Sequence, residues 1–244
     1  MKLVYQFSKK LNYKQLDRIV ELYKKSYEIN SNFHNIKLYT DIESVELLES
    51  HFNEIEIVDT SDLLFLDDLK FKILQRISNN EVLCDGDLFL RKKLNILDDV
   101  DILCDIIFEI ENTVNRDFYD YYRETSEVLV QNGIKKIFPF YENNLEKVIN
   151  VGLLWFRDKQ VKNNFVENYF LQKSWIIENG LEKKYNFTKD YKKTVTFSQY
   201  FLTIFANEKQ LRVKSFRDYC DYIHYSGDIK FEKNFMKRFE PRIF

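Results

Sequence analysis

The stretch Val82-Leu83-Cys84-Asp85-Gly86-Asp87-Leu88-Phe89 decides which fold we expect for this chain. Residues 81–84 are typical of a short buried strand, and the strand ends at Asp85-Gly86-Asp87. The glycine relaxes the turn, so two carboxylates two residues apart can direct oxygens at one hard cation such as Mg²⁺ or Mn²⁺. Three residues of this type also fit many ordinary turns. Their position after a buried strand is what favours a functional interpretation.

Strand-like and helix-like segments alternate on the N-terminal side of this stretch. The predicted strands are residues 3–7, 36–39, 55–58 and 81–84, and the predicted helices are residues 13–28, 42–51 and 61–77. This alternation predicts a parallel, doubly wound α/β sheet with right-handed crossovers. Ligands of such sheets bind beyond the carboxyl ends of the strands, where Thr40-Asp41 and Asp85-Gly86-Asp87 stand.

The second half of the chain is more mixed. We predict strands over residues 101–110, 150–156 and 219–225, helices over 116–131, 158–180 and 198–207, and a loop over 183–193. There is no internal repeat, low-complexity tract or clear linker, so the chain is interpreted as a single domain.

Composition excludes several classes of protein. The 244 residues are 45% hydrophobic and 31% charged, and a net charge of −2 leaves no overall positive field for nucleic acid. No apolar stretch is long enough for a transmembrane segment, and the N-terminus lacks the apolar region of a secretory signal, which predicts a cytoplasmic protein. Cys84, Cys104 and Cys220 are odd in number and form no C-x-x-C pair, so we expect buried reduced thiols.

Several single residues remain open to two interpretations. His224 ends an apolar segment, where a neutral imidazole can complete a metal site or can simply be a satisfied structural histidine. Lys230 can reach a phosphate or remain a solvated lysine. Gly152 lies within an apolar segment, where glycine costs stability unless something approaches closely. Asp101 and Asp105 lie about 13 Å apart on an extended strand, too far for a glycosidase pair.

Motifs taken in chain order resemble one family. They are Leu38-Tyr39-Thr40-Asp41, the segment with Lys70, Asp85-Gly86-Asp87, Asn150-Val151-Gly152-Leu153, Ser198-Gln199, and His224-Tyr225-Ser226-Gly227-Asp228-Ile229-Lys230. This order resembles GT-A-fold glycosyltransferases that use nucleotide sugars, in particular the glycogenin-like and bacterial galactosyltransferase-like families and their uncharacterised bacterial relatives. The resemblance implies an α/β, GT-A-like (Rossmann-like) fold: a mixed, mostly parallel sheet flanked by helices. Residues 1–90 would form the nucleotide-binding half, and residues 91–244 the acceptor half with a C-terminal segment for metal and diphosphate.

The same resemblance implies roles for individual residues. Asp85, Asp87 and His224 would bind Mn²⁺ or Mg²⁺, and Asp87 and Gln199 would be the catalytic residues, with Gln199 on the acceptor side. The other expected contacts are with the diphosphate (Gly227, Lys230), the donor phosphate or ribose (Lys70), the donor sugar (Asn150, Gly152) and the base (Phe7, Ser8). Ser198 departs from the family pattern, which usually has an acidic residue before the glutamine.

The implied function is metal-dependent transfer of a sugar from a UDP-sugar to a hydroxyl acceptor, with retention of configuration. The acceptor is left open between a polysaccharide, a glycolipid, a protein and a modified nucleic acid. Two other functions remain as alternatives. One is a non-catalytic GT-A-like module that binds a sugar nucleotide or a partner protein. The other is a metal-dependent nucleotidyl- or phosphotransferase, since D-x-D motifs also serve there.

Overall fold

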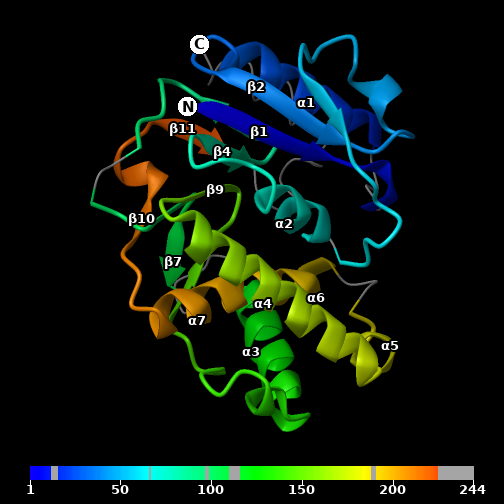
Figure 1. Cartoon of the computed structure of the whole chain (residues 1–244), viewed down its shortest axis with the longest axis vertical. Coiled ribbons are helices and arrows are strands. Elements are labelled where there is room, and N and C mark those ends of the chain that lie inside the picture. Colours follow the sequence, from blue (N-terminus) through cyan, green and yellow to red (C-terminus); the bar gives the residue numbers. More distant parts are fainter. Residues whose placement is uncertain (12–15, 66, 97–98, 110–115, 188–190, 225–244) are drawn as a thin grey trace.

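A computed structural model describes residues 1–11, 16–65, 67–96, 99–109, 116–187 and 191–224. Its central sheet has seven strands in the order β10-β6-β9-β4-β1-β2-β3 (Figure 1). Their bounds are β1 Lys2–Phe7, β2 Asn35–Thr40, β3 Ile55–Ile57, β4 Glu81–Cys84, β6 Ile102–Cys104, β9 Leu153–Phe156 and β10 Val213–Ser215. Two small sheets pair β5 (Leu88–Leu90) with β11 (Tyr222–His224) and β7 (Ile107–Glu109) with β8 (Lys147–Ile149).

One strand runs against the other six in the central sheet. β1 is parallel to β2 and β4, β2 to β3, and β6 to β10, whereas β9 is antiparallel to both of its neighbours, β4 and β6. The predicted mixed, mostly parallel α/β sheet is therefore confirmed. The reversal has a consequence for the site: the amino end of β9 lies at the same edge as the carboxyl ends of β4 and β6.

Apolar side chains on alternate positions fill a core on each face of the sheet, as the period of two along a strand requires. On one face, strand residues such as Leu83 pack with α2 (Asp68–Leu74), α4 (Lys159–Glu178) and α7 (Phe201–Glu208). On the other, residues such as Val82 pack with α1 (Leu16–Asn30), β5 and β11. Figure 1 shows the helices distributed on the two sides of β1.

The long helices match the sequence patterns. α3 covers Arg116–Gln131, the predicted range. α4 is capped by Asp158, whose carboxylate accepts hydrogen bonds from the backbone N–H groups of Gln160 and Val161. Gly180 then adopts a left-handed conformation and α5 (Leu181–Lys184) begins. None of the helices that the structure describes has the length and apolar character needed to cross a membrane.

Two predicted helices near the N-terminus are wrong or too long. Within 42–51 the chain forms only a 3₁₀ turn at Val45–Leu47, because the Ser44 hydroxyl donates back to Asp41. Within 61–77 the helix is limited to Asp68–Leu74. The backbone N–H groups of Leu64 and Phe65 donate to the Asp68 carboxylate, and this local bonding replaces the helical pattern before Asp68.

Segments of the second half also differ from prediction. The strand predicted over 101–110 splits into β6 and β7, which belong to different sheets. In the described part of the strands predicted over 150–156 and 219–225, strand structure is limited to β9 and β11, and residue 225 lies outside the described residues. The helix predicted over 198–207 starts as a π-helix, Thr196–Tyr200, and α5 and α6 (Tyr191–Val195) occupy the ends of the predicted loop. The three cysteines are buried and free, as predicted.

Candidate metal centre

Asp85, Asp87 and His224 come together at the carboxyl edge of the sheet. Each offers one ligand atom, and these atoms lie within 4.8 Å of one another. The His224 Nε2 is 3.3 Å from Asp87 Oδ1 and 3.9 Å from Asp85 Oδ2. The imidazole is almost fully buried, with 3% of its surface exposed.

Strand pairing explains how residues 137 or more positions apart in sequence meet. Asp85 follows the last residue of β4. Asp87 directly precedes β5, and β5 pairs with β11 in a register that sets Leu88 opposite His224. The antiparallel pairing of β5 with β11 therefore places the histidine beside the turn that bears both aspartates.

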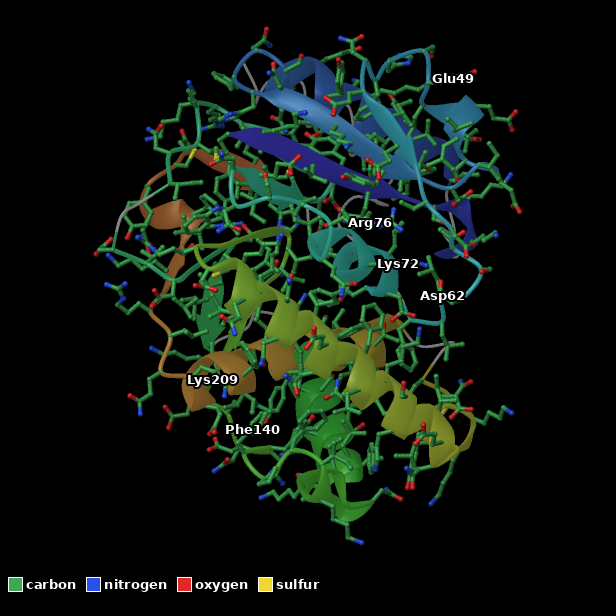
Figure 2. All side chains as sticks on the ribbon, viewed as in Figure 1. Glu49, Asp62, Lys72, Arg76, Phe140 and Lys209 are labelled. Carbon is green, nitrogen blue, oxygen red and sulfur yellow. The ribbon has the colours of Figure 1, made fainter. Side chains whose placement is uncertain are left out.

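A buried lysine stands beside Asp85. Lys70 lies on α2, and its Nζ is 3.0 Å from Asp85 Oδ1 and 3.5 Å from Asp67 Oδ1. The same ammonium donates to the backbone oxygen of Val151 at 3.4 Å. Lys72, two residues further along α2, instead extends to the surface and pairs with Asp62 at 2.7 Å (Figure 2). Helix α2 thus directs one lysine toward the site and the other toward solvent.

Gln6 supports Asp85 from the neighbouring strand. The β1–β4 register pairs Tyr5 with Cys84, so Gln6 falls next to Asp85. The amide of Gln6 donates to Asp85 Oδ1 at 2.8 Å. The Asp85 carboxylate is therefore held from two sides, by Gln6 and by Lys70.

Asp105, at the end of β6, contacts the other side of His224. Its Oδ2 is 2.5 Å from His224 Nδ1, and its side chain is 1% exposed. The hydroxyl of Tyr222 donates to Asp105 Oδ1 at 2.6 Å, and Arg217 Nε lies 3.6 Å from the same oxygen. Asp105 is thus a fully engaged buried carboxylate.

Two glycines allow close approach at this edge. A Cβ on Gly152 would lie 2.3 Å from His224 Cε1 and 2.9 Å from His224 Nδ1, so only glycine leaves room for the ring. A Cβ on Gly86 would lie 2.3 Å from ring atoms of Tyr23. The backbone N–H of Gly152 donates a hydrogen bond to Asn150 Oδ1 at 2.8 Å, and this bond fixes the turn before β9. The predicted close approach at Gly152 is that of the histidine.

Neighbouring residues of opposite charge decide whether the buried ionisable side chains of the centre are protonated. Burial opposes the charge on His224, but Asp105 and Asp87 outweigh it and raise the pKa of His224 to about 10. Burial likewise opposes the charge on Lys70, yet Asp85 and Asp67 keep its pKa above the usual value. Burial, with Asp87 adding to it, raises the pKa of Asp85. His224 and Tyr222 outweigh burial at Asp105 and lower its pKa.

The donor set fits a divalent cation. Atoms bound to one ion at about 2.1 Å lie about 3 Å apart when adjacent in an octahedron and about 4.2 Å when opposite. The separations of 3.3 Å and 3.9 Å from Nε2 to the two carboxylates fall in this interval. Two carboxylates and one imidazole suit a borderline or hard ion such as Mn²⁺ or Mg²⁺.

The remaining predicted residues are placed as follows. Gln199 lies in the π-helix, and its Oε1 accepts a hydrogen bond from Tyr122 at 2.6 Å. Ser198 donates to Asp67, the residue that contacts Lys70. Phe7 ends β1 and Ser8 follows it; both are buried, and the Phe7 ring packs edge-on against Tyr23. Gly227 and Lys230 lie outside the described residues.

The sequence patterns do not indicate Gln6, Asp67 or Tyr222 as site residues, and they relate Asp105 only to Asp101. Asp105 carried a usable signal, because it follows an apolar run as Asp85 does, at the carboxyl end of a strand. Ser198 stands where the family pattern usually has an acidic residue. In the structure its hydroxyl donates to the carboxylate of Asp67, so an acidic group from another part of the chain lies beside this position. That contact depends on tertiary packing and leaves no sequence pattern.

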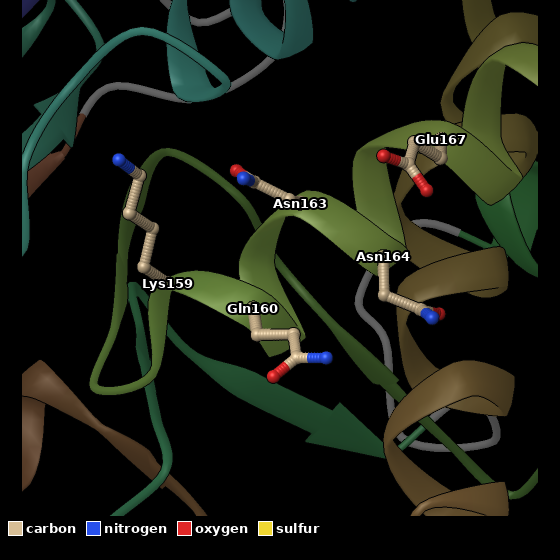
Figure 3. A pocket seen from close by; sticks show the side chains of 5 residues that line it. All are labelled: Lys159, Gln160, Asn163, Asn164 and Glu167. Atoms are coloured by element: carbon tan, nitrogen blue, oxygen red, sulfur yellow. The ribbon is translucent and has the colours of Figure 1, made fainter.

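A hollow lies on α4, away from the candidate centre, and is lined by Lys159, Gln160, Asn163, Asn164 and Glu167 (Figure 3). All five side chains come from the first turns of one helix. That helix follows the carboxyl end of the antiparallel strand β9, so the hollow stands at the opposite edge of the sheet from Asp85. It has no part in the candidate centre.

No protein-family model and no curated protein matches the chain. Among solved structures, the galactosyltransferase LgtC in complex with donor and acceptor sugar analogues is similar over 88% of this chain and 73% of that chain, at 13% identity and a TM-score of 0.46. A structure of an active-site mutant of LgtC gives the same identity and TM-score over 72% of its length. At this sequence identity and TM-score, the similarity says nothing about the activity of this chain.

Proposed function

We propose that this protein is a metal-dependent glycosyltransferase that takes a sugar from a nucleoside-diphosphate sugar, with UDP as the nucleotide, and transfers it to a hydroxyl group. The observation that carries the proposal is the group of Asp85, Asp87 and His224 beside the buried ammonium of Lys70. These residues stand in the chain order of the GT-A family that the sequence resembles.

The charges of the group suit a diphosphate only when a cation is present. Without a metal ion, the protonated His224 and Lys70 balance the two aspartates, so the group has no net positive charge for a phosphate. With His224 neutral as a ligand, a bound divalent ion would give the group a net positive charge and would stabilise the charge that develops on the departing diphosphate. Lys70 supplies a fixed positive charge from the α2 side, and fixed charge of this kind is usually the largest catalytic contribution.

Other residues then have roles toward the two substrates. Gln6 and Lys70 orient the Asp85 carboxylate. Because Gln199 Oε1 accepts from Tyr122, its amide nitrogen is the group that can donate to a substrate hydroxyl. We place Gln199 on the acceptor side and Asn150 and Gly152 along the donor sugar, and we propose retention of configuration, as the resemblance implies.

Thermal unfolding with nucleotide sugars, with and without Mn²⁺, tests the proposal. A donor at about 100 times its Kd stabilises the native protein by about 2.7 kcal/mol. For a chain of this length that corresponds to a rise in Tm of about 5–10 °C. The rise should require Mn²⁺ and disappear in Asp87→Ala. The control Asp62→Ala, at an exposed aspartate paired with Lys72, should behave like wild type.

Product analysis separates the alternatives. Release of UDP with a new glycosidic bond supports the proposal. Products that retain the sugar–phosphate bond indicate a nucleotidyl- or phosphotransferase, and Mn²⁺-dependent donor binding without turnover indicates a non-catalytic module. Equal thermal shifts in wild type and Asp87→Ala would contradict the metal-dependent assignment.

A further inference from the structure

We propose that Asp105 is the positioning residue of the metal centre: it holds the His224 ring so that Nε2, and not Nδ1, faces Asp85 and Asp87. This inference rests on the proposed function in one respect, namely that the group binds a divalent ion. It assigns a residue that makes no contact with the ion and acts through the histidine.

The contact itself is short and buried. Asp105 Oδ2 lies 2.5 Å from His224 Nδ1, and the two side chains are 1% and 3% exposed. A neutral imidazole has one N–H and one lone pair. When Nδ1–H donates to the carboxylate, the lone pair is on Nε2, which lies 3.3 Å from Asp87 Oδ1. Carboxylates that hold metal-binding histidines in this way are common around metal ions.

Asp105 is itself held in place. Tyr222 donates to both its carboxylate, at 2.6 Å, and its backbone oxygen, at 2.7 Å. Ser215 donates to that backbone oxygen at 2.6 Å. Arg217 approaches Oδ1 at 3.6 Å, leaving Oδ2 for the histidine. The carboxylate therefore has little freedom to follow a ring that turns away.

Gly152 closes the remaining side of the ring. The imidazole occupies the space that a Cβ at position 152 would fill, 2.3 Å from His224 Cε1. The β5–β11 register fixes the backbone of His224 opposite Leu88. The β5–β11 pairing thus fixes the backbone of His224, Gly152 limits the position of its ring, and Asp105 holds its Nδ1. Nε2 is the ring nitrogen that faces the two aspartates.

Two substitutions of Asp105 distinguish its role in orienting the His224 ring from a general role in folding. Asp105→Asn keeps one oxygen for Nδ1–H, because the Tyr222 hydroxyl can accept from the new amide while it donates to the backbone oxygen. Asp105→Leu removes the acceptor. Asp101→Asn is the matched control, since Asp101 lies on the same strand segment four residues earlier and pairs with Arg212.

The first measurement is the Kd for Mn²⁺ of each purified protein, from the EPR signal of free Mn²⁺. We expect Asp105→Leu to bind Mn²⁺ about 10- to 100-fold more weakly than wild type, and Asp105→Asn to recover most of that loss. Asp101→Asn should match wild type. The second measurement is the ¹⁵N NMR spectrum of the histidine rings with Zn²⁺ bound. His224 should carry its proton on Nδ1 in wild type and Asp105→Asn.

The outcomes distinguish the two proposals. If wild type binds Mn²⁺ and both Asp105 variants bind equally well, Asp105 has only a structural role and the inference fails while the proposed function stands. If wild type binds no divalent ion, both fail. If Asp105→Leu does not fold, Asp105→Asn decides alone: an Nδ1-protonated His224 supports the inference, and a proton on Nε2 overturns it.

Discussion

Substitution of Gly152 by alanine tests the packing of the centre directly. The new Cβ would lie 2.3 Å from His224 Cε1, whereas ordinary contacts begin near 3.4 Å. The ring would have to retreat by about 1.1 Å. It cannot do so freely, because its Nδ1 is held 2.5 Å from Asp105. The backbone at Gly152 lies outside the left-handed region, so the effect is steric and not conformational.

The expected loss follows from the displaced ligand. Disturbing the support of a metal-binding histidine costs about 10- to 100-fold in affinity, or about 1.4–2.7 kcal/mol. Overpacking adds about 1–3 kcal/mol to the loss of folding stability. Gly152→Ala should therefore lower both the Mn²⁺ affinity and the Tm.

Mn²⁺ titration followed by EPR, with thermal unfolding in parallel, checks this expectation. The control is Gly180→Ala, where φ is +65° and nothing lies within 4 Å of the added Cβ. It should cost about 1–2 kcal/mol of stability through its backbone and leave Mn²⁺ binding unchanged. In a His224→Ala background, Gly152→Ala should have no further effect on affinity. A Gly152→Ala protein that binds Mn²⁺ like wild type would refute the argument.

Two further predictions concern charge. The pKa of His224 rises from 6.5 to about 10, so its protonation stabilises the metal-free fold fully below pH 6.5, and this stabilisation is lost as the pH rises to about 10. Because a metal must displace that proton, the apparent Kd for Mn²⁺ should fall about tenfold per pH unit from about pH 6.5 to 8.5; a flat profile in titrations would contradict this. Lys70→Met should tighten Mn²⁺ binding alone by roughly tenfold or more, because the ammonium 3.0 Å from Asp85 no longer competes, while UDP binding weakens. Calorimetry checks the signs, with Lys72→Met as control because Lys72 is half-buried away from the centre and pairs with Asp62, and weaker Mn²⁺ binding in Lys70→Met would count against them.

The sequence predicted the architecture because its strongest signals are periodic. Runs such as residues 81–84 and 153–156 are apolar enough to require burial on both faces, and α3 and α4 carry helical periodicity over many residues. Short elements were less predictable. The helix expected from residue 61 begins only at Asp68, because the Asp68 carboxylate accepts hydrogen bonds from the backbone N–H groups of Leu64 and Phe65. The periodicity of apolar residues does not reveal such a local side-chain contact.

The three side chains of the candidate centre were predictable from the sequence, but the residues that hold them in place were not. Asp85 and Asp87 follow a buried strand and His224 ends an apolar segment, and the structure places their ligand atoms together. Gln6 contacts Asp85 because of the β1–β4 register. Asp105 contacts His224 because β9 lies antiparallel between β4 and β6, so that both of these strands end at the same edge of the sheet. Such contacts depend on the order of strands in the sheet, which periodicity does not specify.

The pairing of β11 with β5 also sets when the centre can be assembled. Chains emerge from the ribosome N-terminus first, and Asp85 and Asp87 leave it well before His224. Until β11 pairs with β5, the nascent protein lacks His224 at the two aspartates, and the space beside Gly152 that the imidazole fills is open. If the group binds a divalent ion as proposed, that ion would find its complete ligand set only after β11 has paired with β5.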